Sequence, residues 1–200
     1  MKKTNHTIRL SSFSTFLPPL IKIVVMCAVL LSGPLRAAIL NWSGGGGANA
    51  NWNNSANWGG AGTPQNFDTL VFPAGQPNQV NTNNISNLNL NRICFAGAGG
   101  GYDIRGNGFA LTNSIMATNT AGANTIENNI TFSNTTITIL VSNSVSLTLA
   151  GSLSASVFVA NVTKIGPGTL IYSGSTANTY TNLTTVNEGE LDLPRPAFRP

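Results

Sequence analysis

Short stretches of alternating apolar and polar residues recur along the chain beyond Asn41. The apolar positions of these stretches are Leu88 and Leu90; Ile126, Ile130 and Phe132; Ile137, Ile139 and Val141; Val145, Leu147 and Leu149; Leu170 and Tyr172; and Leu191 and Leu193. Alternation with a period of two places one face of a short strand in a core and the other face in water. Convincing helical periodicity is absent, so the pattern predicts an all-β protein.

The distance between successive strands favours one β architecture over another. Taking one inward residue from each strand gives steps of 21, 17, 23 and 21 residues, along Leu111, Phe132, Leu149, Tyr172 and Leu193. A step of about twenty residues is typical of one coil of a β-solenoid. Asn, Ser, Thr and Gly fill the remaining positions, where stacked coils form polar ladders. We therefore predict a parallel β-helix, and an antiparallel β-sandwich, with turns every 8–12 residues, stays the alternative.

Glycines separate the predicted strands. Gly166, Pro167 and Gly168 predict a fixed corner, because proline sets φ between two residues that tolerate positive φ.

The first 37 residues have the layout of a secretory signal peptide. Basic residues precede an apolar run over residues 23–31, helix breakers follow it, and Ala37 offers a small residue at the cleavage point. The apolar run is about nine residues long, whereas a membrane span needs roughly 20. We predict cleavage after Ala37, a secreted or cell-surface location, and no stable membrane span.

Removal of this segment changes the charge of the chain. Five of the ten basic residues and the single histidine, His6, lie within residues 1–37, while all six acids follow, which leaves a net charge of −1. The alkaline pI of the whole chain therefore gives no support to a nucleic-acid partner. Cys94 is then the single cysteine, and its neighbours Ile93 and Phe95 predict a small buried side chain.

One segment near the end of the chain resembles a known family. Residues 164–174 read KIGPGTLIYSG, residues 178–181 read NTYT and residues 184–191 read TTVNEGEL. These residues are similar to one copy of the autotransporter-associated β-strand repeat. Asn182 and Leu183 depart from that repeat, which prefers two glycines there. The resemblance implies a right-handed parallel β-helix that is exported or exposed at a bacterial surface, with no catalytic residues and no cofactor to transfer.

The start of the predicted mature chain also resembles the opening of such proteins. It contains Trp42, Trp52 and Trp58, followed by a DTLVF run at residues 68–72. We predict a Trp/Gly/Asn-rich cap over residues 38–84, a solenoid over residues 85–193 with one clear repeat at residues 164–193, and a Pro-rich tail over residues 194–200.

Two groups of residues are candidates for binding or chemistry. Trp42, Trp52 and Trp58 are possible glycan contacts if their rings are exposed, and otherwise they pack as a cap. Glu188, Glu190 and Asp192 alternate, so they share one face if they lie on a strand. Three interpretations stay open: a Ca²⁺ site, carboxylates of a polysaccharide-acting enzyme, or a solvated outer face.

Taken together, the sequence predicts a structural or adhesive surface protein without catalytic activity and without a metal or cofactor. Surface glycans or other surface proteins are the expected partners. A carbohydrate-binding module and a polysaccharide-acting enzyme remain alternatives.

Overall fold

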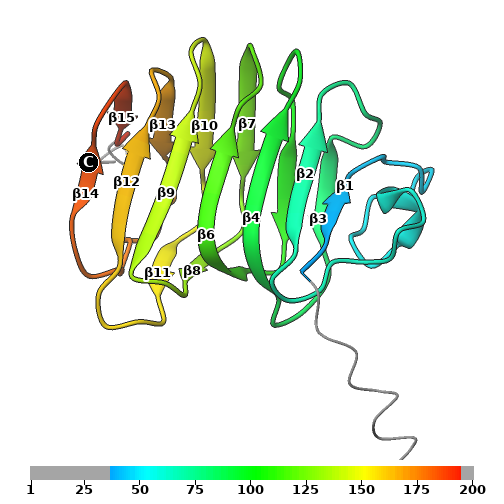
Figure 1. Cartoon of the computed structure of the whole chain (residues 1–200), viewed down its shortest axis with the longest axis horizontal. Helices are drawn as coiled ribbons and strands as arrows, with labels where there is room; N and C mark the ends of the chain where they lie inside the picture. Colours follow the sequence, from blue (N-terminus) through cyan, green and yellow to red (C-terminus); the bar gives the residue numbers. More distant parts are fainter. Residues whose placement is uncertain (1–36, 195–200) are drawn as a thin grey trace, which may run out of the picture. The chain divides into compact units, whose positions relative to one another are not determined.

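The computed structural model describes residues 37–194, which form a parallel β-solenoid of about five turns (Figure 1). Nine strands form one hydrogen-bonded sheet: β1 (Ile39–Asn41), β2 (Thr69–Pro73), β4 (Asn89–Ala96), β6 (Phe109–Ala117), β8 (Ile130–Phe132), β9 (Thr136–Val141), β11 (Leu153–Ala155), β12 (Asn161–Ile165) and β14 (Thr184–Val186). Six strands form the other: β3 (Val80–Asn83), β5 (Asp103–Gly106), β7 (Gly122–Ile126), β10 (Val145–Leu149), β13 (Thr169–Tyr172) and β15 (Glu190–Asp192).

The predicted parallel β-helix is confirmed, and the antiparallel sandwich is wrong. Every ladder between named strands of the described chain is parallel, from β1 with β2 to β13 with β15. Figure 1 shows the two sheets as stacked rows, with short β8 and β11 on a third side. Each coil therefore turns a corner between two or three short strands.

The coil length agrees with the prediction in part. Beyond the first step, the number of residues between paired positions of neighbouring coils varies little. The shortest separation is that of Thr169 and Glu190, and the longest is that of Thr136 and Asn161. The predicted steps from Leu111 to Phe132 and from Leu149 to Tyr172 are true ladder pairs. The shorter predicted step from Phe132 to Leu149 is wrong, because β8 and β10 lie on different sides of the coil and Phe132 pairs with Ala155 instead.

The core consists of columns of apolar side chains, one from each coil. Leu70, Ile93, Ile115 and Ile139 follow one another in register in the larger sheet, and all are fully buried. In the smaller sheet the corresponding column is Ile104, Ile126, Leu149 and Tyr172. Because each coil buries its apolar face only against the next, these columns supply most of the burial that stabilises the stack.

The predicted corner at Gly166, Pro167 and Gly168 joins β12 to β13. Gly166 has a φ of 81°, which favours glycine. A Cβ at Gly168 would meet the carbonyl oxygens of Ser142 and Val145 in the preceding coil. The corner therefore needs glycine because two coils approach each other closely there.

The boundary predicted at residue 85 does not appear as a break in the fold. Within the predicted cap segment, β1 and β2 continue the larger sheet and β3 begins the smaller one. Between β1 and β2, residues 42–68 form a long connection that contains the 3₁₀-helix Ser55–Trp58. Cap and solenoid are thus one continuous stack.

Two residues that were predicted to be buried are corrected. Cys94 is half-buried on the outer face of β4, with its sulfur 3.8 Å from the Thr118 hydroxyl, because its neighbours Ile93 and Phe95 take the inward positions. Leu193 follows the last strand and is 61% exposed. Most of the predicted signal peptide and of the Pro-rich tail, residues 1–36 and 195–200, lies outside the described residues. Within residues 37–194 no helix has the length and apolar character needed to cross a membrane.

Candidate functional site

The three tryptophans are core residues at the β1 end of the stack. Each is at most 1% exposed, and the rings of Trp42 and Trp58 meet edge to face at 5.1 Å. All three indole rings lie within about 6 Å of Phe72 on β2. In this arrangement no indole face is open for stacking on a sugar ring, which corrects the glycan-contact interpretation of Trp42, Trp52 and Trp58.

Polar groups hold the tryptophans in place. The Trp42 indole nitrogen donates to the carbonyl oxygen of Pro77 at 3.1 Å, and that of Trp52 donates to Oδ1 of Asn81 at 2.7 Å. The Trp58 indole nitrogen donates to the carbonyl oxygen of Trp52 at 2.9 Å. The buried Asn57 donates to the carbonyls of Asn49 and Asn51. The Asn-rich composition of this segment therefore satisfies the backbone of a loop that covers the core.

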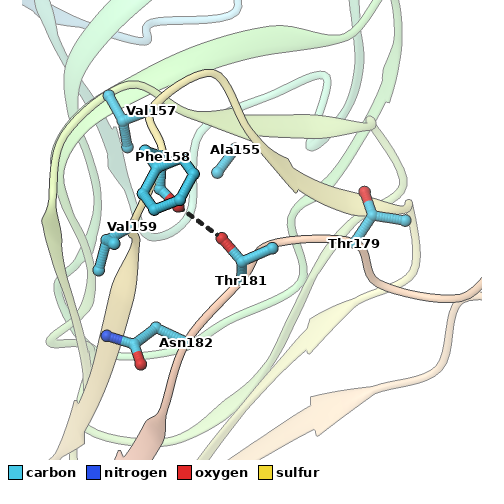
Figure 2. A pocket seen from close by; sticks show the side chains of 7 residues that line it. All are labelled: Ala155, Val157, Phe158, Val159, Thr179, Thr181 and Asn182. Carbon is cyan, nitrogen blue, oxygen red and sulfur yellow. Dashed lines mark hydrogen bonds between the residues drawn. The ribbon is translucent and has the colours of Figure 1, made fainter.

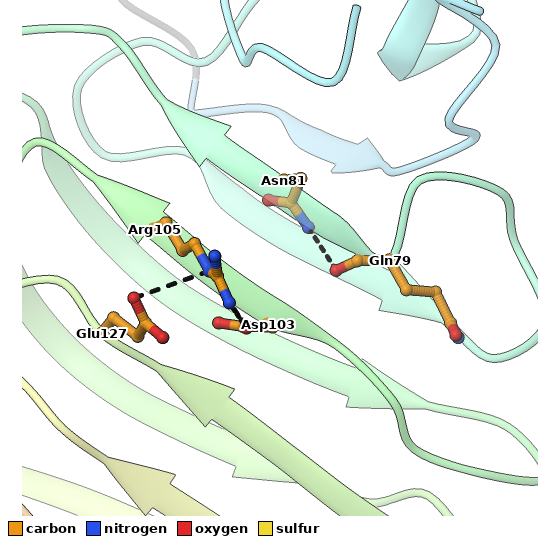
Figure 3. Close-up of polar contacts among 5 residues, drawn as sticks. All are labelled: Gln79, Asn81, Asp103, Arg105 and Glu127. Atoms are coloured by element: carbon orange, nitrogen blue, oxygen red, sulfur yellow. Dashed lines mark hydrogen bonds and ion pairs between the residues drawn. The ribbon is translucent and has the colours of Figure 1, made fainter. Parts of the chain in front are cut away.

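One small charged cluster lies on the outer face of the smaller sheet (Figure 3). The Arg105 guanidinium donates to Asp103 on the same strand, and its Nε lies 3.5 Å from a carboxylate oxygen of Glu127 in the next coil. The hydrogen bond to Asp103 and the charges of both acids raise the pKa of Arg105. The charge of Arg105 thus offsets an acid on its own strand and one on the neighbouring coil, which is a structural arrangement for exposed charges.

The predicted acidic trio does lie at one place. Glu188 precedes β15, while Glu190 and Asp192 lie on it, and all three side chains are exposed at the last coil. Among the described residues, no group of three or more His, Cys, Asp or Glu side chains is placed to hold a metal ion. The arrangement matches the predicted solvated outer face.

Sequence reasoning missed one feature on the surface, a groove beside Phe158 (Figure 2). Phe158 is 95% exposed, and the groove has a volume of about 400 Å³. It is lined by Ala155, Val157, Phe158, Val159, Thr179, Thr181 and Asn182. The Thr181 hydroxyl donates to the Phe158 carbonyl at 2.8 Å, which ties the two walls together. The available signal was the run Val157, Phe158, Val159, which breaks the period of two.

A second missed feature is the inward orientation of Lys164. This lysine takes the core position that Ile139 occupies one coil earlier, and its side chain is fully buried. Its Nζ donates to the Gly166 carbonyl at 2.6 Å and to the Glu188 carbonyl at 2.9 Å. Burial lowers the pKa of this ammonium group, and the charge of Glu188 opposes the shift. Lys164 therefore joins the corner after β12 to the corresponding corner of the last coil.

Comparisons with models of protein families, with curated proteins and with solved structures found no match to this chain. The similarity to the autotransporter-associated repeat therefore stays a prediction from residues 164–193.

Proposed function

We propose that this chain is an exported structural or adhesive surface protein, in which a rigid β-solenoid presents rows of neutral polar side chains to other surfaces. The observation that carries the proposal is a row of outward side chains along the larger sheet. Thr138, Thr163 and Thr185 follow one another in register on β9, β12 and β14, and each is at least partly exposed.

The regular spacing of this row suits repeated weak contacts. Neighbouring strands lie about 4.8 Å apart, so hydroxyl groups recur along the stack at that interval. Thr138 and Thr163 are partly exposed on adjacent strands. Several weak hydrogen bonds to one polymeric surface act together, because the second contact is intramolecular once the first has formed.

The adhesive part of the proposal is tested by removing hydroxyl groups from the row. The double variant Thr138→Val, Thr163→Val should reduce retention on immobilised surface polysaccharides and on bacterial cells several-fold. Thr148→Val is the matched control, because Thr148 is an outward residue of β10 on the other sheet. Equal retention of all three proteins would remove the row from the proposal.

Export is tested separately. Expressed from its full sequence in a Gram-negative host, the protein should be recovered outside the cytoplasm with Ala38 as its first residue. Recovery of the uncut chain in the cytoplasm would contradict an exported surface protein.

A carbohydrate-binding module is a second candidate, favoured by the Phe158 groove. Aromatic faces stack on the apolar faces of sugar rings, and the hydroxyls and the amide of Thr179, Thr181 and Asn182 line the same groove without a charged group. Phe158→Ala should then abolish retardation in polysaccharide affinity gels, whereas Phe67→Ala, a change at another exposed phenylalanine, should not. Unchanged retardation of Phe158→Ala would exclude this groove as the binding site.

A further inference from the structure

The last coil keeps the apolar pattern of the interior, but none of residues 37–194 packs over it. Val186 on β14 continues the fully buried column of Ile115, Ile139 and Lys164, yet it is 40% exposed. Leu191 pairs with the fully buried Leu170 and is itself only partly buried. Apolar residues thus occupy the inward positions of the last coil, at the end of the stack that faces water.

Unpaired sheet edges lie around these apolar residues. Within residues 37–194, β14 pairs with β12 and β15 pairs with β13, and each is the last strand of its sheet (Figure 1). An edge strand presents a row of free N–H and C=O groups, which another strand can pair with. The apolar centre and the two edges together have the form of the junction between any two coils of this molecule.

The charges at this end indicate what kind of coil fits. Glu188, Glu190 and Asp192 are exposed, so a second copy that met this end with its own last coil would bring like charges together. The chain shows the favourable solution further along the same sheet, where Arg105 lies against Glu127 of the neighbouring coil (Figure 3).

We propose that the end formed by β14 and β15 is a docking surface for a further β-solenoid coil. That coil has apolar residues over Val186 and Leu191 and carries Lys or Arg opposite Glu190 and Asp192. It binds by pairing its strands with both free edges, as the coils inside the stack do.

The experiment adds such a coil to the whole chain. A second copy of residues 173–193 is inserted after Leu193, because this segment is as long as the step between the paired residues Thr169 and Glu190 and so keeps the register. The basic form of the inserted copy carries Glu188→Lys, Glu190→Lys and Asp192→Lys. It should raise the melting temperature by at least about 2–4 °C, because it buries apolar side chains of the original last coil, and it should slow amide exchange in the original β14 and β15 at least about tenfold.

Two further inserted copies serve as controls. A copy with Val186→Ser, Leu191→Ser and Leu193→Ser should give neither effect, because its inner face cannot cover the original end. A copy with the acids retained should stabilise less than the basic copy. If the basic copy leaves both the melting temperature and amide exchange unchanged, the docking surface is disproved, and if the acidic copy stabilises equally, the stated charge of the partner is wrong.

Sedimentation of the unmodified chain tests whether a second copy of the chain covers this end instead. A monomer is the expected result. A dimer that Val186→Lys abolishes and Phe158→Lys preserves would show that a second copy covers this end, and it would overturn the assignment to a basic coil.

Discussion

The two ends of the described solenoid differ in how far their apolar core is covered. At the β1 end, the core is covered by the indoles of Trp42, Trp52 and Trp58, which a long polar connection holds in place. At the β14 end, Val186 and Leu193 continue the core columns and remain exposed. A repeating pattern builds the interior of a stack, but only residues that break the pattern can close its end.

The largest effect is expected at the covered end. Trp52→Ala should lower the free energy of unfolding by about 3–5 kcal/mol, because it removes a fully buried ring that packs on Trp58, Phe72 and Phe109. It also leaves the Asn81 side chain without the indole donor. Urea unfolding followed by circular dichroism measures the change, and a loss below about 1 kcal/mol would show that the indole layer does not stabilise this end.

The corner that joins the last coil to the stack should show a smaller effect. Lys164→Met keeps an unbranched side chain of nearly the same length but removes the donor to the Gly166 and Glu188 carbonyls, which costs about 1–3 kcal/mol when buried acceptors lose their partner. Ile139→Met is the control in the same column, and a volume-conserving change of this kind costs less than about 1.5 kcal/mol. Amide exchange in β15 should accelerate in Lys164→Met alone. A variant as stable as the parent protein would contradict the bridging role.

Much of the fold was predictable because it rests on local alternation. The period of two in residues 137–149 and the glycine corner at residues 166–168 report inward positions and close approach directly. The steps through Leu111, Phe132 and Leu149 failed in part because alternation identifies a strand without saying on which side of the coil it lies.

The candidate sites were harder to predict, since they depend on contacts between distant residues. The burial of Trp52 requires Asn81, which lies far along the chain in β3 and supplies its hydrogen-bond acceptor. Lys164 occupies an inward slot because Glu188, in the next coil, supplies a carbonyl for its ammonium group. Neither partner can be recognised from local pattern alone.

Two buried tyrosines provide a smaller contrast along the stack. The Tyr102 hydroxyl donates to the Pro73 carbonyl at 2.7 Å, whereas the buried Tyr172 hydroxyl lies near that of Tyr180 but makes no hydrogen bond of good geometry among the described residues. Tyr102→Phe should therefore cost about 1 kcal/mol and Tyr172→Phe should be neutral or slightly stabilising. Urea unfolding at pH 7 measures both, and equal losses would contradict the assigned hydrogen bonds.

Alkaline pH extends the same comparison. Burial raises the pKa of both phenols, so above the unfolded value of about 10 the unfolded chain releases protons that the folded chain retains. The free energy of unfolding should consequently fall as the pH rises beyond about 10, and each Phe variant should flatten that fall. The lowered pKa of Lys164 has the opposite effect: below about pH 10.5 it makes the free energy of unfolding rise with pH. The measurement is therefore best made in the Lys164→Met background. A slope that neither Phe variant changes would show that these phenols do not cause it.

The smallest loss of stability at the two ends is expected for Leu193→Ala at the open end. The same substitution at Leu149, in an interior coil of the same column, gives the comparison. Leu149 is 1% exposed and pairs with Tyr172. Leu193 follows Asp192, the partner of Ile171, so it extends the same column by one coil beyond Tyr172, and 61% of its surface is exposed. Leu149→Ala should cost about 2–5 kcal/mol, because it leaves a cavity between coils. Leu193→Ala should stay within about 0.5 kcal/mol, because water already surrounds most of the side chain that it removes. Similar losses for both variants in urea unfolding would mean that Leu193 is already covered in solution, and that the two ends of the stack are equally closed.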